Sequence, residues 1–159
     1  AAVIGLAAIG GVHGRDRLAI HALFRSRGLT IGTLVHPDAS VCATARLGHG
    51  TQVLAQAVVA ADARIGEGCI INHRAAVDHE CTLGNGVHIA PGATLCGCIT
   101  LGDNVMVGAG AVILPRVSVG ADAVIGAGAV VNKNVAAGTT VAGNPARVLG
   151  VPLPYSGKP

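Results

Sequence analysis

A series of branched aliphatic residues recurs every six positions through most of this chain without one interruption. The residue two positions before each member is small or β-branched, as at Ala39, Ala45 and Cys69. Side chains two positions apart in a strand point to the same side, so both sets face one interior. Repetition at a fixed short period predicts a solenoid. The members are Val35, Val41, Leu47, Val53, Val59, Ile65, Ile71, Val77, Leu83, Ile89, Leu95, Leu101, Val107, Ile113, Val119, Ile125 and Val131.

A second period is superimposed on the first and is three of these six-residue units, or hexads, long. Gly48, Gly66, Gly84, Gly102 and Gly120 each directly follow a member of the aliphatic series. Three hexads therefore form one coil, and we expect these glycines to supply positive φ at one tight corner. Coils stack by parallel strand pairing, about 4.8 Å apart. The pattern predicts an all-β triangular prism over residues 35–147, in which residues 35–136 form between five and six coils.

Composition argues against several classes of protein. Hydrophobic residues make up 51% of the chain and aromatic residues 1%, which fits a thin aliphatic core and argues against disorder. No apolar stretch reaches the roughly 20 residues of a membrane-spanning helix. A net charge of +3 without stacking aromatics argues against a nucleic-acid partner. Five cysteines, an odd number without a C-x-x-C pair, favour reduced thiols and a cytoplasmic location.

The two ends depart from the repeat. Residues 1–34 suggest a strand over 1–10, a helix over 15–27 and a second β-type run over 29–35, hence a partial βαβ unit. No G-x-G-x-x-G spacing follows the first strand, so a dinucleotide site is not predicted. The run from Gly143 to Arg147 closes the prism, and the proline-containing residues 148–159 are expected to form a loose tail.

Candidate chemistry gathers around His79. The step of three hexads places Gly97 one coil above it and Ala61 one coil below, so its imidazole has almost no neighbouring side chain. Asp78 and Glu80 flank it in sequence, and a carboxylate near an imidazole fixes the tautomer and stabilises the imidazolium. A general base working near neutral pH needs those properties. The alternative is that His79 is an ordinary surface residue at a corner.

The same stretch resembles a known family. Asn72, then His79-Glu80-Cys81, then His88 resemble the N-x6-H-[ED]-C…H pattern of hexapeptide-repeat sugar acyltransferases, typified by sialic-acid O-acetyltransferases and bacterial UDP-4-amino-sugar N-acetyltransferases. The Leu-Val-His-Pro run at 34–37 and the Gly-Asn-Pro-Ala run at 143–146 agree with that subgroup. Family members fold as left-handed parallel β-helices, form homotrimers and place active sites between neighbouring prisms.

The resemblance implies roles for individual residues. The residue matching His79 is the proposed base and that matching Glu80 supports it. The residue matching His88 lies near the acyl thioester, and that matching Gly97 offers backbone hydrogen bonds to acetyl-CoA. We expect Asn72 and His73 to contact the acceptor, and the corners at Ala109 and Ala127 to line a groove for CoA.

These observations predict direct acyl transfer from acetyl-CoA to an amine or hydroxyl of a sugar, with no metal. The sugar is expected to be nucleotide-linked, although family members begin with a complete Rossmann-like domain and residues 1–34 match only its last strand–helix–strand. Two alternatives stay open. One is a γ-type carbonic anhydrase, whose three-histidine metal site His73, His79 and His88 do not match in spacing. The other is a structural solenoid without a ligand.

Overall fold

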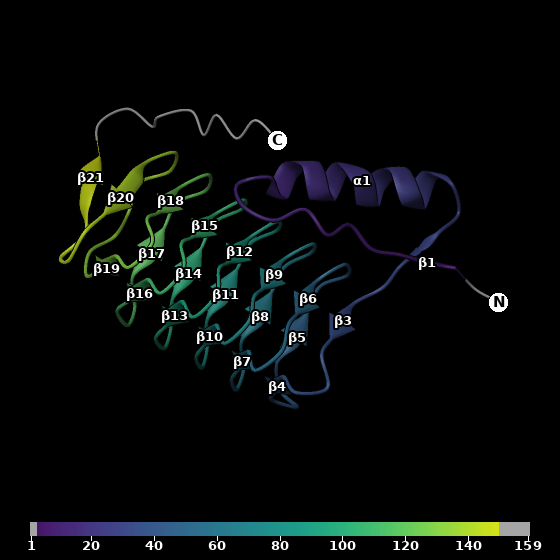
Figure 1. The fold of residues 1–159 in the computed structure, drawn as a ribbon, viewed down its shortest axis with the longest axis horizontal. Helices are drawn as coiled ribbons and strands as arrows, with labels where there is room; N and C mark the ends of the chain where they lie inside the picture. The colour runs from purple at the N-terminus through teal and green to yellow at the C-terminus, as the bar shows by residue number, and fades with distance from the viewer. Residues whose placement is uncertain (1–2, 150–159) are drawn as a thin grey trace.

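The computed structural model describes residues 3–149, which form a parallel β-solenoid with one helix laid along it (Figure 1). Each side of the prism is a sheet of strands that are two or three residues long. The six-stranded face contains β4 (Ser40–Val41), β7 (Val58–Val59), β10 (Ala76–Val77), β13 (Thr94–Leu95), β16 (Val112–Ile113) and β19 (Val130–Val131). The five-stranded face contains β5 (Arg46–Leu47), β8 (Arg64–Ile65), β11 (Thr82–Leu83), β14 (Thr100–Leu101) and β17 (Ser118–Val119).

The third side, the eight-stranded face, includes both ends of the solenoid. Its strands are β3 (Leu34–Val35), β6 (Gln52–Val53), β9 (Ile70–Ile71), β12 (His88–Ile89), β15 (Met106–Val107), β18 (Val124–Ile125), β20 (Thr140–Ala142) and β21 (Arg147–Leu149). Between neighbouring coils the parallel register advances by three hexads, as in the pairing of Val77 with Leu95. The expected fold class, a parallel β-helix of hexapeptide repeats, is confirmed.

The aliphatic series forms the core. Ile71, Leu95 and Ile125 are fully buried, as are the small residues Ala75 and Ala111 that precede members of the series by two. The first coil is less covered, and Val35 is 45% exposed. Burying aliphatic surface contributes about 25 cal/mol per Å², so a core this thin gains stability by repeating its layers.

Turns stack in three columns, one at each edge of the prism. The open corner leads from the six-stranded to the five-stranded face and includes residues 78–81 and 96–99. The helix corner leads to the eight-stranded face and includes residues 66–69 and 84–87. The far corner completes the coil and includes residues 72–75, 90–93, 108–111 and 126–129.

The glycines that recur once per coil serve a different purpose from the one expected. None of the five has positive φ; that conformation falls two residues later, as at Gly50, Gly68 and Gly86. Instead, a Cβ at Gly48 would lie 2.5 Å from the backbone carbon of Gly66 in the next coil. Our expectation of positive φ at these glycines was therefore wrong, because close approach between coils is what excludes a side chain there.

The segment before the solenoid forms a βαβ unit. β1 (Ile4–Gly5) pairs in parallel with β2 (Thr30–Ile31), and α1 (Gly14–Ser26) connects them. The side chain of Arg17 on α1 is fully buried and donates to the carbonyl oxygens of Ile9, Gly68 and Gly86. These bonds hold both α1 and the chain before it against the helix corner.

The C-terminal end of the solenoid is closed by a hairpin. β21 pairs antiparallel with β20, so Val148 and Leu149, expected in the tail, belong to a strand. The rest of that expected tail lies outside the described residues. Within residues 3–149, no helix has the length and apolar character needed to cross a membrane.

Candidate active site

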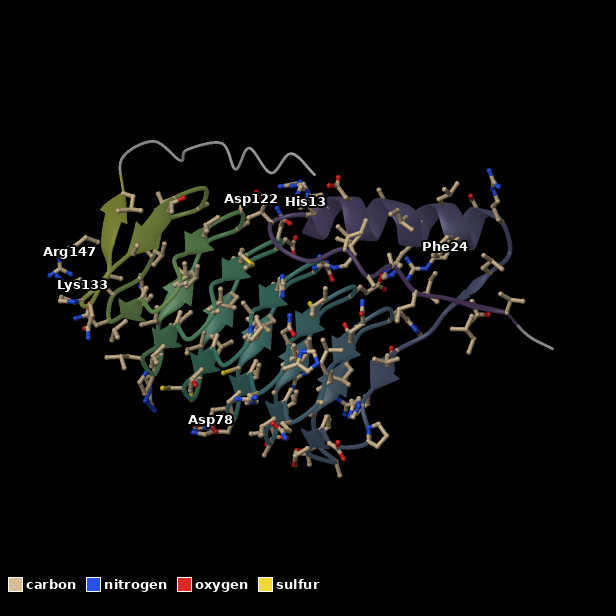
Figure 2. The ribbon with its side chains drawn as sticks, viewed as in Figure 1. His13, Phe24, Asp78, Asp122, Lys133 and Arg147 are labelled. Carbon is tan, nitrogen blue, oxygen red and sulfur yellow. The ribbon has the colours of Figure 1, made fainter. Side chains whose placement is uncertain are left out.

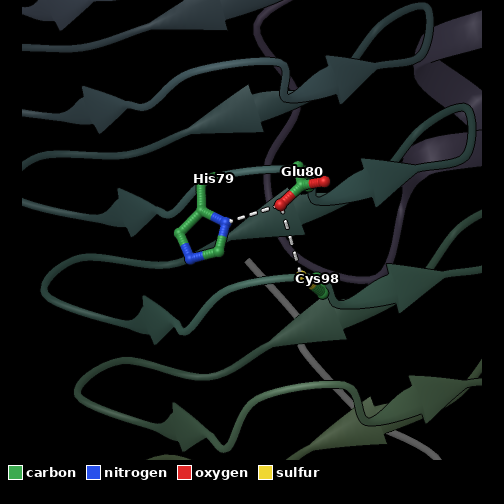
Figure 3. Close-up of side chains that lie close together, drawn as sticks. All are labelled: His79, Glu80 and Cys98. Carbon is green, nitrogen blue, oxygen red and sulfur yellow. Dashed lines mark hydrogen bonds and ion pairs between the residues drawn. The ribbon is translucent and has the colours of Figure 1, made fainter.

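His79 and Glu80 lie next to each other at the open corner. His79 Nδ1 is 3.0 Å from Glu80 Oε2 (Figure 3). The two side chains are 52% and 63% exposed, and neighbouring Asp78 projects on the side of the solenoid away from α1 (Figure 2). A carboxylate at this distance accepts a hydrogen bond from Nδ1–H and leaves Nε2 as the basic nitrogen.

The His79 ring packs against Gly97. A Cβ at residue 97 would overlap His79 Nε2, so a larger residue at this position requires the His79 ring to move. The carbonyl of Gly97 accepts from Arg116 N–H at 3.1 Å. Within residues 3–149, no hydrogen-bond acceptor pairs with Gly97 N–H. The open corner therefore places a free backbone donor beside a basic nitrogen.

Cys98 joins this group through Glu80. Its Sγ lies 3.7 Å from Glu80 Oε2, the oxygen that also faces His79 (Figure 3). The sequence analysis did not connect these residues, although the one-coil step that places Gly97 over His79 also places Cys98 over Glu80. The buried thiols differ: burial raises the pKa of Cys69 to about 12 and that of Cys81 to about 11, which suits core residues.

His88 occupies a closed environment. Its side chain on β12 is 6% exposed, and Nδ1 accepts a hydrogen bond from Gly11 N–H at 2.6 Å. Burial lowers the pKa of His88 to about 4, and the charge of Arg17 acts in the same direction. The ring is therefore neutral at pH 7. Because Nδ1 is the acceptor, the proton sits on Nε2. No sequence signal pointed to Gly11 as the partner.

Asn72 lies between His88 and His73 at the far corner. Its side-chain Nδ2 is 3.2 Å from His88 Nε2, and its Oδ1 accepts from the backbone N–H of His73 at 2.8 Å. His73 Nδ1 lies 2.8 Å from the same oxygen. Asn72 and His73 are thus hydrogen-bonded, whereas Asn72 Nδ2 and the protonated Nε2 of His88 are both donors and are neighbours without a hydrogen bond.

The predicted residues therefore form two groups within one chain. His79, Glu80 and Gly97 lie at the open corner, whereas Asn72, His73 and His88 lie at or next to the far corner. Ala109 and Ala127, the expected CoA contacts, are exposed in the far-corner column, where Gly128 N–H donates to Ala109 O. The six-stranded face separates the two groups.

Two hollows lie on other parts of the solenoid from His79. A shallow groove of about 360 Å³ crosses the five-stranded face between Arg46, Arg64 and Thr82. A cleft of about 250 Å³ at the C-terminal end includes Lys133 and Arg147, which lie close together in Figure 2. Neither hollow includes His79 or Glu80, whose side chains are more than half exposed at the open corner.

The three histidines of the carbonic anhydrase alternative, which that family contributes from two subunits, do not come together within one chain. Among residues 3–149, the group whose ligand atoms lie within 4.8 Å of one another consists of His79, Glu80 and Cys98, without His73 or His88. His88 Nδ1 is already engaged by Gly11. Nothing in this arrangement reproduces a zinc site with three histidines and an open fourth position.

Comparison with known proteins adds the family context. The family model for bacterial transferase hexapeptide repeats (six repeats) matches residues 62–97 and 98–133. The acetyltransferase domain of PglB from Neisseria gonorrhoeae FA1090 is 40% identical, with a TM-score of 0.85 over 87% of this chain and 68% of that chain. The same domain is also known in complex with acetyl coenzyme A.

Two further solved structures are similar. Perosamine N-acetyltransferase from Caulobacter crescentus, in complex with CoA and GDP-perosamine, is 35% identical, with a TM-score of 0.89 over 92% of this chain and 69% of that chain. WeeI from Acinetobacter baumannii AYE is 30% identical, with a TM-score of 0.87 over 92% of this chain and 70% of that chain. No curated protein matches the sequence.

Proposed function

The chain belongs to the hexapeptide-repeat acetyltransferases, and from that membership we propose that it acetylates an amine or hydroxyl of a nucleotide-linked sugar with acetyl-CoA. A complex of one relative contains acetyl coenzyme A, and a complex of another contains CoA and GDP-perosamine. We further propose that residues 1–34 are the last part of a nucleotide-sugar-binding unit, since their βαβ unit packs on the helix corner.

The observation that carries this proposal is the arrangement of His79 between Glu80 and Gly97. Nδ1 faces the carboxylate at 3.0 Å, so Nε2 is available to take a proton. The acceptor nitrogen or oxygen attacks the thioester carbonyl while Nε2 removes its proton. The tetrahedral intermediate then collapses with cleavage of the C–S bond, and the imidazolium returns the proton to the leaving thiolate. Glu80 stabilises the imidazolium between these steps.

Gly97 N–H is positioned for the negative charge that develops in this reaction. It has no acceptor within residues 3–149 and belongs to the turn of the next coil, which contacts the His79 ring. Backbone donors fixed before the reaction stabilise a developing oxyanion without reorganising. Gly97 thus has two roles. Its N–H donates a hydrogen bond to the acyl donor, and its lack of a side chain leaves room for the His79 ring.

His88 is a hydrogen-bond donor to the acyl donor in this proposal, because its neutral ring carries a proton on Nε2. Gly11 N–H holds Nδ1 at 2.6 Å and so determines the tautomer. Asn72 lies 3.2 Å from Nε2 and keeps that edge of the ring polar. His73, at the exposed end of this set, contacts the acceptor.

The complete site requires a second copy of the chain. His79 and His88 lie on opposite sides of the six-stranded face, so one chain does not bring them together. A homotrimer in which the open corner of one prism meets the far corner of its neighbour unites the two groups. The groove between the prisms then places CoA along Ala109 and Ala127. Five free cysteines are compatible with a reducing cytoplasm.

The first experiment is calorimetric titration of the purified protein with acetyl-CoA, followed by an acetyl-transfer assay on a panel of nucleotide-linked amino sugars and hydroxyl sugars. We expect saturable binding with one site per chain, and acetylation of at least one member of the panel. Absence of binding at millimolar acetyl-CoA contradicts the proposal.

The shared site has its own test by complementation. His79→Ala and Asn72→Ala chains are each expected to be nearly inactive, but an unfolded and refolded equal mixture regenerates about a quarter of the sites with both groups intact. Activity is measured in the mixture and in each variant refolded alone. Equal inactivity of all three samples, with trimers shown by light scattering, contradicts a site shared between chains.

A further inference from the structure

We propose that His79, Glu80 and Cys98 form an inhibitory binding site for a thiophilic divalent cation such as Zn²⁺. Three ligand types that zinc prefers, an imidazole nitrogen, a carboxylate oxygen and a sulfur, have their atoms within 4.8 Å of one another. They come from successive coils of the open corner, and the one-coil register holds their backbones in fixed relation (Figure 3).

The distances fit tetrahedral coordination with small adjustments. Zinc bonds of about 2.0–2.3 Å place tetrahedral ligand atoms roughly 3.3–3.6 Å apart. In the structure, Glu80 Oε2 is 3.0 Å from His79 Nδ1 and 3.7 Å from Cys98 Sγ. One cation can therefore replace the proton that His79 and Glu80 share. The exposure of both residues leaves the fourth position to water or to an incoming ligand.

The chemistry of the imidazole explains why binding inhibits. During acetyl transfer, Nδ1 carries a proton toward Glu80 and Nε2 is the base. A cation on Nδ1 uses the lone pair of that nitrogen, so the neutral ring keeps its proton on Nε2. Nε2 then has no lone pair for the acceptor proton. Inhibition follows without any blockage of the acetyl-CoA groove, and this part of the inference rests on the proposed function.

Direct binding is measured on reduced, chelator-treated protein with Zn²⁺ and, as a spectroscopic probe, Co²⁺. Wild-type protein should bind one Zn²⁺ per chain at this site, and Co²⁺ should show near-ultraviolet thiolate-to-metal absorption. Cys98→Ser should lose that absorption and weaken Zn²⁺ binding by at least about 100-fold, because loss of partners that merely orient ligands already costs about 10–100-fold.

Two further variants keep the test decisive. Cys96→Ser changes the thiol on the other side of Gly97, which is not in the group, and should bind like wild type. Cys98→Asn suits the left-handed backbone of this position, φ 61°, and should remain folded without the thiolate. Wild-type binding in Cys98→Ser or Cys98→Asn, or an absorption band that disappears in Cys96→Ser instead, overturns the proposal.

Inhibition is then measured by mass spectrometry of the acetylated sugar, because a thiol reagent would compete for the metal. Zn²⁺ at saturating concentration should abolish turnover in wild type and Cys96→Ser, a chelator should restore it, and Cys98→Ser should resist. Zinc binding without inhibition overturns the inhibitory role of this site. Loss of turnover in all proteins before Zn²⁺ is added contradicts the proposed function instead.

Discussion

The helix corner and the open corner share one backbone plan, with left-handed residues at the same place in each turn, such as Gly86 in one and Glu80 in the other. They differ in what covers them. At the helix corner, α1 buries Arg17 and His21 completely. At the open corner, His79 and Glu80 remain more than half exposed. The comparison shows that inward residues specify the turn, whereas outward residues are free to be structural at one corner and chemical at the other.

The largest expected effect is on turnover at the open corner. His79→Ala should lower kcat by about 10²–10⁴, the range for loss of a general base. Because the side chain is half exposed, the melting temperature should stay close to that of wild type. Steady-state kinetics and thermal unfolding measure the two effects. Near-normal turnover in this variant rules out His79 as the base.

The opposite result is expected at the helix corner. Arg17→Met leaves the carbonyl groups of Ile9, Gly68 and Gly86 without their buried donor, at a cost of about 1–3 kcal/mol for each unsatisfied group. Denaturant unfolding should show this loss. Arg15→Met is the matched control on the same helix, since its partner Asp122 is in an exposed pair, and should unfold like wild type. Equal stability of both variants contradicts the contrast between the corners.

Acid should destabilise the folded protein through the buried side chain of His88. His88 titrates near pH 4 when folded and near 6.5 when unfolded, so the unfolded state takes up the proton first. Stability is therefore full above pH 6.5 and falls between about pH 6.5 and 4, by up to about 3 kcal/mol. Denaturant titrations across this range measure the slope. His88→Gln should flatten it, and an unchanged slope in that variant assigns the effect to other groups.

A smaller effect is expected from Gly97→Ala. The added Cβ displaces the His79 ring, and a displacement of about 1 Å lowers turnover by up to about 10². If the glycine acts only through the ring, the same change made on a His79→Ala background should lower the residual rate no further. A further loss in the double variant shows a separate contribution from Gly97, such as a shift of its N–H.

Sequence periodicity predicted the repeating part of the fold because each strand and its partner lie at fixed separations along the chain. The six-residue aliphatic series places each strand, and a step of three hexads gives each partner, as with Val77 and Leu95. The same step placed Gly97 against His79 in the next coil. Applied once more it connects Glu80 with Cys98, a contact that the sequence contained and that we did not draw from it.

Other features had no periodic signal. Gly11 and Arg17 precede the repeat, so nothing in their spacing indicated that they reach His88 and the turn carbonyls. The purpose of the repeating glycines was mistaken because positive φ and close approach both select glycine, and the sequence does not distinguish them. Which residues share a corner became evident only when the turns were assigned to the three columns.

Because the coils are equally spaced, distances along the solenoid change in fixed steps. Each coil advances by about 4.8 Å, so Gly97 lies one step from His79 and Pro115 lies a further step along. Lengthening the reach from His79 to the cleft at Lys133 and Arg147 requires a whole added coil, because a single inserted residue turns inward side chains outward. Changes in the length of this scaffold during evolution are thereby confined to whole coils.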